Sequence, residues 1–170
     1  MFFDADLGDE PPPAWAASID QLRFRGSRVL EEFVFLHRAS ATLIPADLIE
    51  NVEPARLPVI MRWIARMAGI LDPDGKAPVD MRRTFLGRRR EARAGVEHML
   101  AWRPQRVILA HGRCYPDHAE AELHRAFRWT GLPTATPLVS FRRRSVRAQG
   151  LGGMAAQGHL GGIHFTGGLP

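Results

Sequence analysis

The stretch TLIPADLIEN, residues 42–51, decides the fold because it begins like a buried strand and stops on an acid, Asp47. Pro45 has no N–H to donate to a sheet, so the strand is expected to end or lie at an edge near that residue. Further along, RVILAHGRC (residues 106–114) runs through apolar residues to His111. An α/β fold brings such strand-terminal groups together at one sheet edge, which makes Asp47 and His111 candidates for one site. The alternatives are that Asp47 is a turn or helix-capping residue and that His111 with Gly112 forms only a hydrogen-bonded turn.

The residues before this stretch predict two further strands. DQLRFRG (20–26) alternates apolar and polar side chains, and EEFVFLHR (31–38) is rich in β-branched and aromatic residues. With TLIPAD (42–47) as the third strand, the two tight connections indicate an antiparallel meander.

Helical spacing replaces the strand pattern after Pro54. Apolar residues recur three and four apart, which predicts an amphipathic helix that ends at Gly69. The residues of its apolar face are Leu57, Ile60, Met61, Ile64 and Met67. A second helix carries Ala92, Val96, Met99 and Leu100 and closes before Pro104. After the RVILAHG strand, Asp117 and Glu120 predict a capping box that opens a third helix, which runs up to Gly131. The predicted order is three strands, two helices, one strand and one helix, an α/β fold.

Composition bounds the class of protein. A chain of 170 residues with net charge +5 suits one soluble domain, here residues 19–132, after an irregular segment 1–18. Residues 133–170 are basic and rich in glycine, which predicts a disordered tail. A single cysteine suits a reducing cytoplasm, and neither a secretory signal nor a membrane span is visible in the sequence. We therefore expect a cytoplasmic location and no membrane partner.

Two long blocks carry a resemblance to a known family: FRGSRVLEEFVFLHRASATLIPADLIEN (24–51) and WRPQRVILAHGRCYPDHAEAELHRAFRW (102–129). Together they resemble the C-terminal half of an uncharacterised bacterial family of metallo-β-lactamase-like proteins, over about residues 7–129. The resemblance implies part of an αββα sandwich that holds zinc or another divalent metal at its sheet edge. It implies Asp47 as a bridging aspartate ligand and His111 as a later histidine ligand.

The sequence departs from that family where further ligands are expected. No histidines are spaced as in the HxHxDH motif, and the turn that carries a histidine in the family reads FRGS (24–27) here. A hydrolytic zinc site needs roughly three protein ligands and an open water position. We therefore expect an incomplete site with weakly bound metal, and little or no hydrolysis of an unknown small molecule.

Three other residues are weaker candidates. His37 ends the second strand and is either a third ligand or a partnered structural histidine. Cys114 lies near a predicted helix start that favours its thiolate, so it is a ligand, a nucleophile or a half-buried free thiol. Arg113, beside His111, either binds an anion in the cleft or is simply exposed.

Two alternative functions stay open. Nucleic-acid binding would use the arginine clusters, although no recognition motif accompanies them; these are Arg82, Arg83, Arg88, Arg89, Arg90, Arg93, Arg142, Arg143 and Arg144. The second alternative is that the chain is a structural fragment that depends on a partner. As half of a sandwich, it is expected to expose an apolar sheet face and to self-associate through it.

Overall fold

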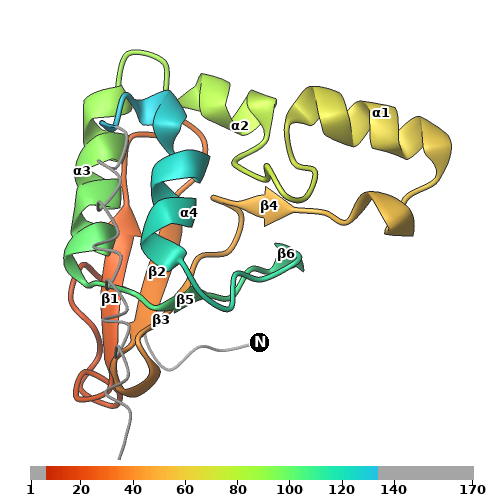
Figure 1. The fold of residues 1–170 in the computed structure, drawn as a ribbon. Coiled ribbons are helices and arrows are strands. Elements are labelled where there is room, and N and C mark those ends of the chain that lie inside the picture. The colour runs from red at the N-terminus through yellow and green to blue at the C-terminus, as the bar shows by residue number, and fades with distance from the viewer. Residues whose placement is uncertain (1–6, 134–170) are drawn as a thin grey trace, which may run out of the picture. The chain divides into compact units, whose positions relative to one another are not determined.

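The computed structural model describes residues 7–133, and these form a mixed α/β fold (Figure 1). The larger sheet contains β1 (Ile19–Phe24), β2 (Glu32–His37), β3 (Thr42–Ile44) and β5 (Arg106–Val107). The smaller sheet contains β4 (Glu50–Asn51) and β6 (His111–Gly112). The α-helices of this part of the chain are α1 (Val59–Ala68), α2 (Val79–Thr84), α3 (Arg89–Ala101) and α4 (Ala119–Ala126). The predicted α/β class is therefore confirmed.

The first three strands form the predicted antiparallel meander. In the larger sheet the order is β1-β2-β3-β5, with β1 and β2 antiparallel, β2 and β3 antiparallel, and β5 parallel to β3. Strand β3 ends at Ile44, directly before Pro45, as the missing N–H of proline requires. Ile44, the last residue of β3, consequently pairs with Phe35 of β2, and the following loop runs on to Glu32 at the start of β2.

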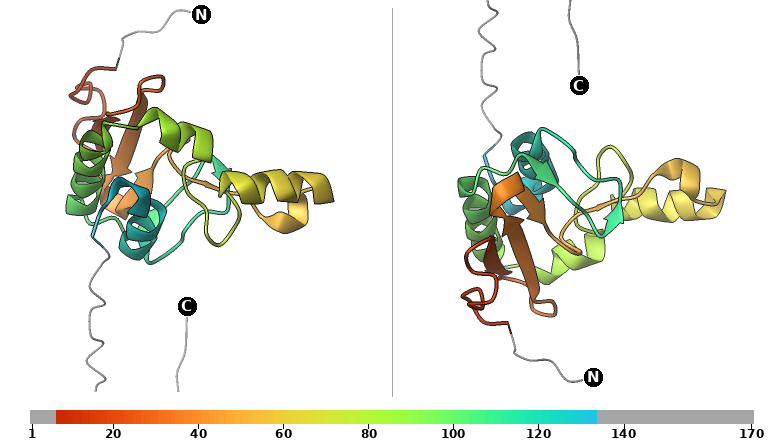
Figure 2. Two further views of the ribbon diagram at one scale, coloured as in Figure 1. Left: turned by 90° about the horizontal axis from the view of Figure 1, so that it is seen from above. Right: turned by 90° about the horizontal axis from the view of Figure 1, so that it is seen from below.

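The hydrophobic core lies between one face of this sheet and the helices α3 and α4 (Figures 1 and 2). Sheet residues Val34, Leu43 and Val107 are buried there against residues of both helices. Three phenylalanine and tryptophan contacts close one end of the core, with ring centroids 5.1–6.0 Å apart: Phe24 with Phe85, Phe24 with Phe127, and Phe85 with Trp129.

The segment RVILAHG does not form one strand, so that prediction was wrong. Strand β5 stops at Val107, which pairs with Tyr115, and the chain between them makes an excursion that carries β6. Leu109 is buried, whereas Ile108 on its neighbouring position is exposed. His111 therefore belongs to the small second sheet and not to the end of β5.

The three predicted helices are present as α1, α3 and α4, but one predicted cap is absent and one helix was not predicted. Gly69 caps α1 with φ 80°, in the left-handed region that glycine favours. The predicted capping box of α4 is absent, because the residue before the helix is His118 at φ 55° and no side chain caps the helix. Asp117 thus lies one residue too early to cap. Helix α2 was not predicted, since its six residues follow a turn sequence and are too few to show a period.

Helix α1 exposes the apolar face that the sequence predicts. Ala65 is its buried residue, while Trp63 is 66% and Met67 77% exposed. Val59, Ile60 and Ile64 are exposed as well. By comparison, the sheet itself exposes Ile44 at 37%. The largest group of exposed apolar side chains among residues 7–133 is therefore on α1, and not on the sheet face where it was expected.

We predict that this apolar face drives self-association. Replacing Trp63 and Ile60 together by glutamate removes a contiguous apolar surface and should shift the chain toward monomer, because apolar area excluded from water stabilises the associated state. Gel filtration with light scattering at several concentrations measures the change. Val29→Glu is the control, since Val29 is 84% exposed but lies outside α1. A wild-type chain that is monomeric throughout would contradict the prediction.

Two predicted segments lie largely outside the described residues. Residues 1–6 of the N-terminal segment and residues 134–170 of the predicted tail are not among them, and residues 7–18 form turns without a helix or strand. Within residues 7–133, none of the helices is both long and apolar enough to cross a bilayer.

Candidate functional site

Asp47 lies in the loop between β3 and β4, and a buried acid holds that loop in place. The carboxylate of Glu32, at the start of β2, accepts hydrogen bonds from the backbone N–H groups of Ala46 (2.7 Å) and Asp47 (2.9 Å). Glu32 is only 7% exposed. The next two residues, Leu48 and Ile49, are buried in or beside the core. The loop is thus anchored on both sides of the Asp47 side chain.

His111 reaches Asp47 from the second sheet. Strand β6 pairs in parallel with β4, which places His111 opposite Glu50. His111 Nε2 lies 3.1 Å from Asp47 Oδ1, and the two side chains are 56% and 45% exposed. The predicted contact between the two residues is therefore present, although it forms through β6 and not at the end of β5. A carboxylate oxygen and an imidazole nitrogen this close can ligate one cation or form a hydrogen-bonded pair.

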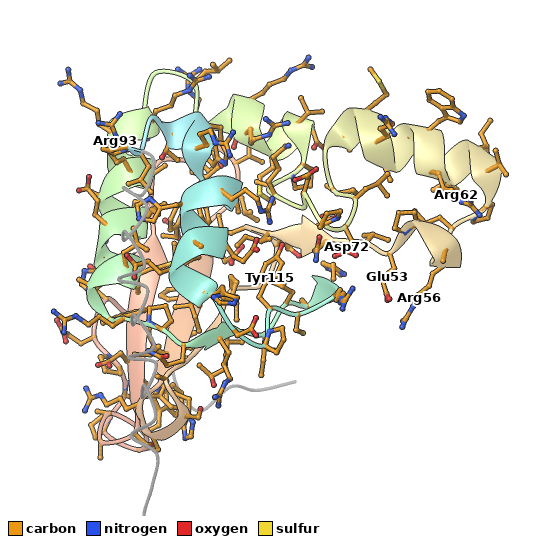
Figure 3. All side chains as sticks on the ribbon, in the orientation of Figure 1. Glu53, Arg56, Arg62, Asp72, Arg93 and Tyr115 are labelled. Carbon is orange, nitrogen blue, oxygen red and sulfur yellow. The ribbon has the colours of Figure 1, made fainter. Side chains whose placement is uncertain are left out.

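A buried asparagine holds the second sheet together. The Asn51 side-chain N–H groups donate to Asp72 Oδ1 (3.0 Å) and to the carbonyl oxygen of Arg113 (2.9 Å), and Asn51 is fully buried. The backbone N–H of Arg113 donates in turn to the Asn51 carbonyl (2.8 Å). Figure 3 shows Asp72 beside the end of β4. These bonds fix the strand that carries His111, so Asn51 positions the site without touching it.

Gly112 is required by the close approach of the two strands. Its φ is +96°, and a Cβ at this position would lie 2.0 Å from the carbonyl oxygen of Asn51. No side chain fits there without moving backbone. The residue beside His111 must therefore be glycine for β4 and β6 to pair.

Burial shifts the pKa values of two acids in or beside the site. Glu50 is half-buried, and burial raises the pKa of its carboxyl, while the charge of His111 lowers the same pKa and the charge of Asp47 raises it. Burial also raises the pKa of Glu32, against the lowering effect of its backbone hydrogen bonds. Burial therefore favours the neutral forms of Glu50 and Glu32, and Asp47 is the carboxylate in direct contact with the imidazole.

His37 lies at the other end of the sheet from Asp47. The antiparallel register places His37 beside Thr42, at the start of β3, whereas Asp47 follows the end of β3 and contacts Glu32. Five residues of extended strand separate Glu32 from His37, or about 17 Å at the rise of a β-strand. His37 Nδ1 lies 2.8 Å from Ser40 Oγ, in the turn that follows. The structure therefore gives His37 a structural partner and keeps it away from the pair.

Cys114 and Arg113 have partners within their own segment. The Cys114 thiol is exposed and interacts with the backbone of Leu109, at 3.4 Å from its N–H and 3.9 Å from its carbonyl oxygen. The Arg113 guanidinium lies 3.6 Å from Asp72 Oδ2. Cys114 thus closes the excursion that carries β6, and Arg113 extends the Asn51 network rather than facing an open cleft.

The ligand set around Asp47 and His111 contains two residues. Within residues 7–133 no group of three or more histidine, cysteine, aspartate or glutamate side chains is arranged to hold a metal ion. The geometry of the pair fits two ligands of one cation, but the set falls short of the three that a catalytic zinc site uses. No catalytic step can be derived from this arrangement.

Sequence reasoning missed Glu32 and Asn51, and only the first had a usable signal. Glu32 lies on the same face of β2 as Val34 and Leu36, which face the core. Its position therefore predicts a buried carboxyl group that needs hydrogen-bond donors. Asn51 follows a short buried segment and shows no pattern that would predict its burial.

Comparison with known proteins found no relative of this chain. No family model, no curated protein and no solved structure matches it. The candidate site is therefore defined by its own geometry: an aspartate and a histidine in contact at a sheet edge, positioned by Glu32, Asn51 and Gly112.

Proposed function

We propose that the chain is a metallo-β-lactamase-like protein whose Asp47 and His111 form an incomplete divalent-metal site with little or no hydrolytic activity. The contact of 3.1 Å between the two side chains carries the proposal. It occurs at the edge of a sheet, between residues that are far apart in sequence, and both side chains are open to solvent. Such a contact supports a role in binding more than one in stability, because exposed pairs stabilise a fold by only about 0–1 kcal/mol.

Two ligands are expected to bind a divalent cation loosely. Most of the coordination shell would be left to water, and a zinc ion supplies a reactive hydroxide only when its ligands fix the position of that water. The carboxyls of Glu32 and Glu50 lie nearby, but burial favours their neutral forms, and Glu32 is committed to the backbone of the Asp47 loop. The residues present therefore support cation binding and offer no support for turnover.

Elemental analysis after exhaustive dialysis tests this proposal. We expect zinc well below one equivalent in the wild-type chain and less still in Asp47→Ala and His111→Ala. Turnover of generic ester, phosphodiester and lactam substrates should stay at the background rate. Each substitution should change the free energy of unfolding by less than about 1 kcal/mol, since the pair is exposed.

Asp117→Ala is the matched control for these variants. Asp117 and His118 form a second exposed acid and histidine pair, 4.0 Å apart, in the same chain. Metal binding that falls equally in this control would point to unspecific association. Near-stoichiometric zinc that Asp47→Ala or His111→Ala removes, together with turnover that follows the metal, would contradict the incomplete site and reveal a working hydrolase.

The arginines between residues 82 and 93 do not share one environment, which weakens support for the alternative of nucleic-acid binding. Arg82 lines a cavity, and Arg93, labelled in Figure 3, donates to the carbonyl oxygen of Thr130 at 3.2 Å. Arg89 and Arg90 are exposed at the start of α3. Nucleic-acid binding through these residues stays a prediction, and a steep loss of affinity with added salt is the measurement that would favour it.

A further inference from the structure

A second site, a cavity beside α2 and the end of α4, shares no lining residue with the Asp47 and His111 pair. Its volume is about 490 Å³, within the range of small-ligand pockets. Its charged and aromatic lining residues are Asp74, Lys76, Arg82, Arg125, Arg128 and Trp129. We name it the Lys76 cavity. Four of these side chains are cationic and one is anionic.

Two of the cations lie near each other beside Gly69, which lines a neighbouring hollow and not the Lys76 cavity itself. A Cβ built on Gly69 would lie 3.6 Å from Lys76 Nζ and 3.4 Å from Arg82 Nη2. Within residues 7–133, neither group has a carboxylate oxygen within 4.0 Å. Asp74 also lines the cavity, but its carboxylate forms no ion pair with either group. Neighbouring like charges repel one another, and an anion between them would relieve that repulsion.

Arg82 is also short of hydrogen-bond acceptors. Its Nε is buried and has no partner in the described part of the chain, and burial lowers the pKa of its guanidinium. Trp129 presents a similar case, because its indole Nε1 is buried without an acceptor. Unpartnered buried donors are uncommon in folded proteins and often indicate a missing partner. Because both of these atoms are covered by protein, a ligand in the cavity would instead be held by the Nη groups of Arg82, which have no hydrogen-bond partner among the described residues.

Arg125 differs from the other cations because its bonds are already made. Its Nε lies 2.7 Å from Glu122 Oε2, its Nη1 donates to the Gly75 carbonyl at 2.9 Å, and its Nη2 donates to Tyr115 Oη at 2.9 Å. Arg125 therefore ties α4 to the loop that carries Lys76. It forms a fixed wall of the cavity, whereas Lys76, Arg82 and the exposed Arg128 are free of ion pairs among the described residues.

We propose that the Lys76 cavity binds a small ligand through a phosphate group, with Lys76 and Arg82 as its principal contacts. A guanidinium presents paired donors that match phosphate oxygens, and an ammonium group adds a compact charge. Arg128, at the exposed side of the cavity, supplies a further cation for the same group. This binding is independent of the Asp47 and His111 pair.

Calorimetric titration with inorganic phosphate, with pyrophosphate and with adenosine monophosphate tests the proposal, each at matched ionic strength. We expect saturable binding that Lys76→Gln and Arg82→Gln each weaken about tenfold or more, the loss of one charge-assisted contact. Tighter binding of adenosine monophosphate than of phosphate identifies a phosphate ester as the ligand, and equal binding identifies the free ion. Asp47→Ala should bind as the wild type does, which separates this site from the proposed metal site.

Arg89→Gln is the matched control, because Arg89 is exposed on α3 and does not line the cavity. Arg128→Gln, also at an exposed position, serves as a further cavity variant if Arg82→Gln fails to melt cooperatively, and it too should weaken binding. Absence of saturable binding by all three probes would overturn the proposal. So would an equal loss of affinity in Arg89→Gln and Lys76→Gln, which would show that unlocalised positive charge binds the probes. A short single-stranded oligonucleotide bound more tightly than any probe and weakened equally by Arg89→Gln would overturn it in favour of a nucleic-acid surface.

Discussion

Gly112→Ala should lower the free energy of unfolding by about 3 kcal/mol or more, the range of severe single substitutions. The backbone at Gly112 has φ +96°, which an alanine adopts only with strain. The new methyl group would also lie 2.0 Å from the Asn51 carbonyl oxygen, which is backbone and has no flexible end to swing aside. The strands β4 and β6 would have to separate, and with them the contact between His111 and Asp47.

Denaturant unfolding monitored by circular dichroism measures this change. Gly8→Ala is the control, because nothing lies within 4 Å of a Cβ at that position. We expect the control to unfold as the wild type does. If Gly112→Ala retains wild-type stability, β4 and β6 are not paired as described, and the positioning of His111 by β6 would be wrong.

The parts of the fold that the sequence predicts are those with a repeated pattern. Strands β1 to β3 show alternation or a β-branched run, and helices α1, α3 and α4 show apolar residues three and four apart. Proline and glycine mark two of the boundaries correctly, at Pro45 and Gly69. The contact between Asp47 and His111 was expected from strand ends meeting at one sheet edge. It is present, but it forms through β6 in the second sheet and not at the end of β5.

The parts that escaped prediction depend on contacts distant in sequence. Strands β4 and β6 have two residues each, too few for any period, and they exist because Asn51 and Gly112 bring two loops together. The solvent exposure of α1 is another such case, since spacing predicts an apolar face but not what lies against it. The absence of a cap at Asp117 depends on the left-handed backbone of His118, which local sequence does not encode.

The second large effect is expected at Glu32, whose carboxylate holds the loop of Asp47. Glu32→Ala leaves the backbone N–H groups of Ala46 and Asp47 without their acceptor, which should cost about 2–3 kcal/mol. Glu32→Gln keeps one acceptor oxygen and should cost less. Glu31→Ala is the control, because Glu31 is an exposed neighbour whose ion pair with Arg23 lies at the surface. Thermal and denaturant unfolding measure all three variants, and an Ala variant no less stable than the control would contradict this role.

The stability difference between wild type and Glu32→Gln should also depend on pH. Burial raises the pKa of the Glu32 carboxyl, so the native state holds the proton more tightly than the unfolded chain, where the pKa is about 4.3. The resulting contribution to stability is fully present below the unfolded pKa and is lost as pH rises through the folded pKa. The glutamine does not titrate, so the unfolding free energy of the wild type should fall relative to that of Glu32→Gln as pH rises across this window. Unfolding curves from about pH 4 to pH 7 measure the difference. If the unfolding free energy of the wild type instead rises relative to that of Glu32→Gln as pH rises, the native state prefers the ionised carboxylate. The backbone hydrogen bonds of Ala46 and Asp47 would then outweigh the burial of Glu32.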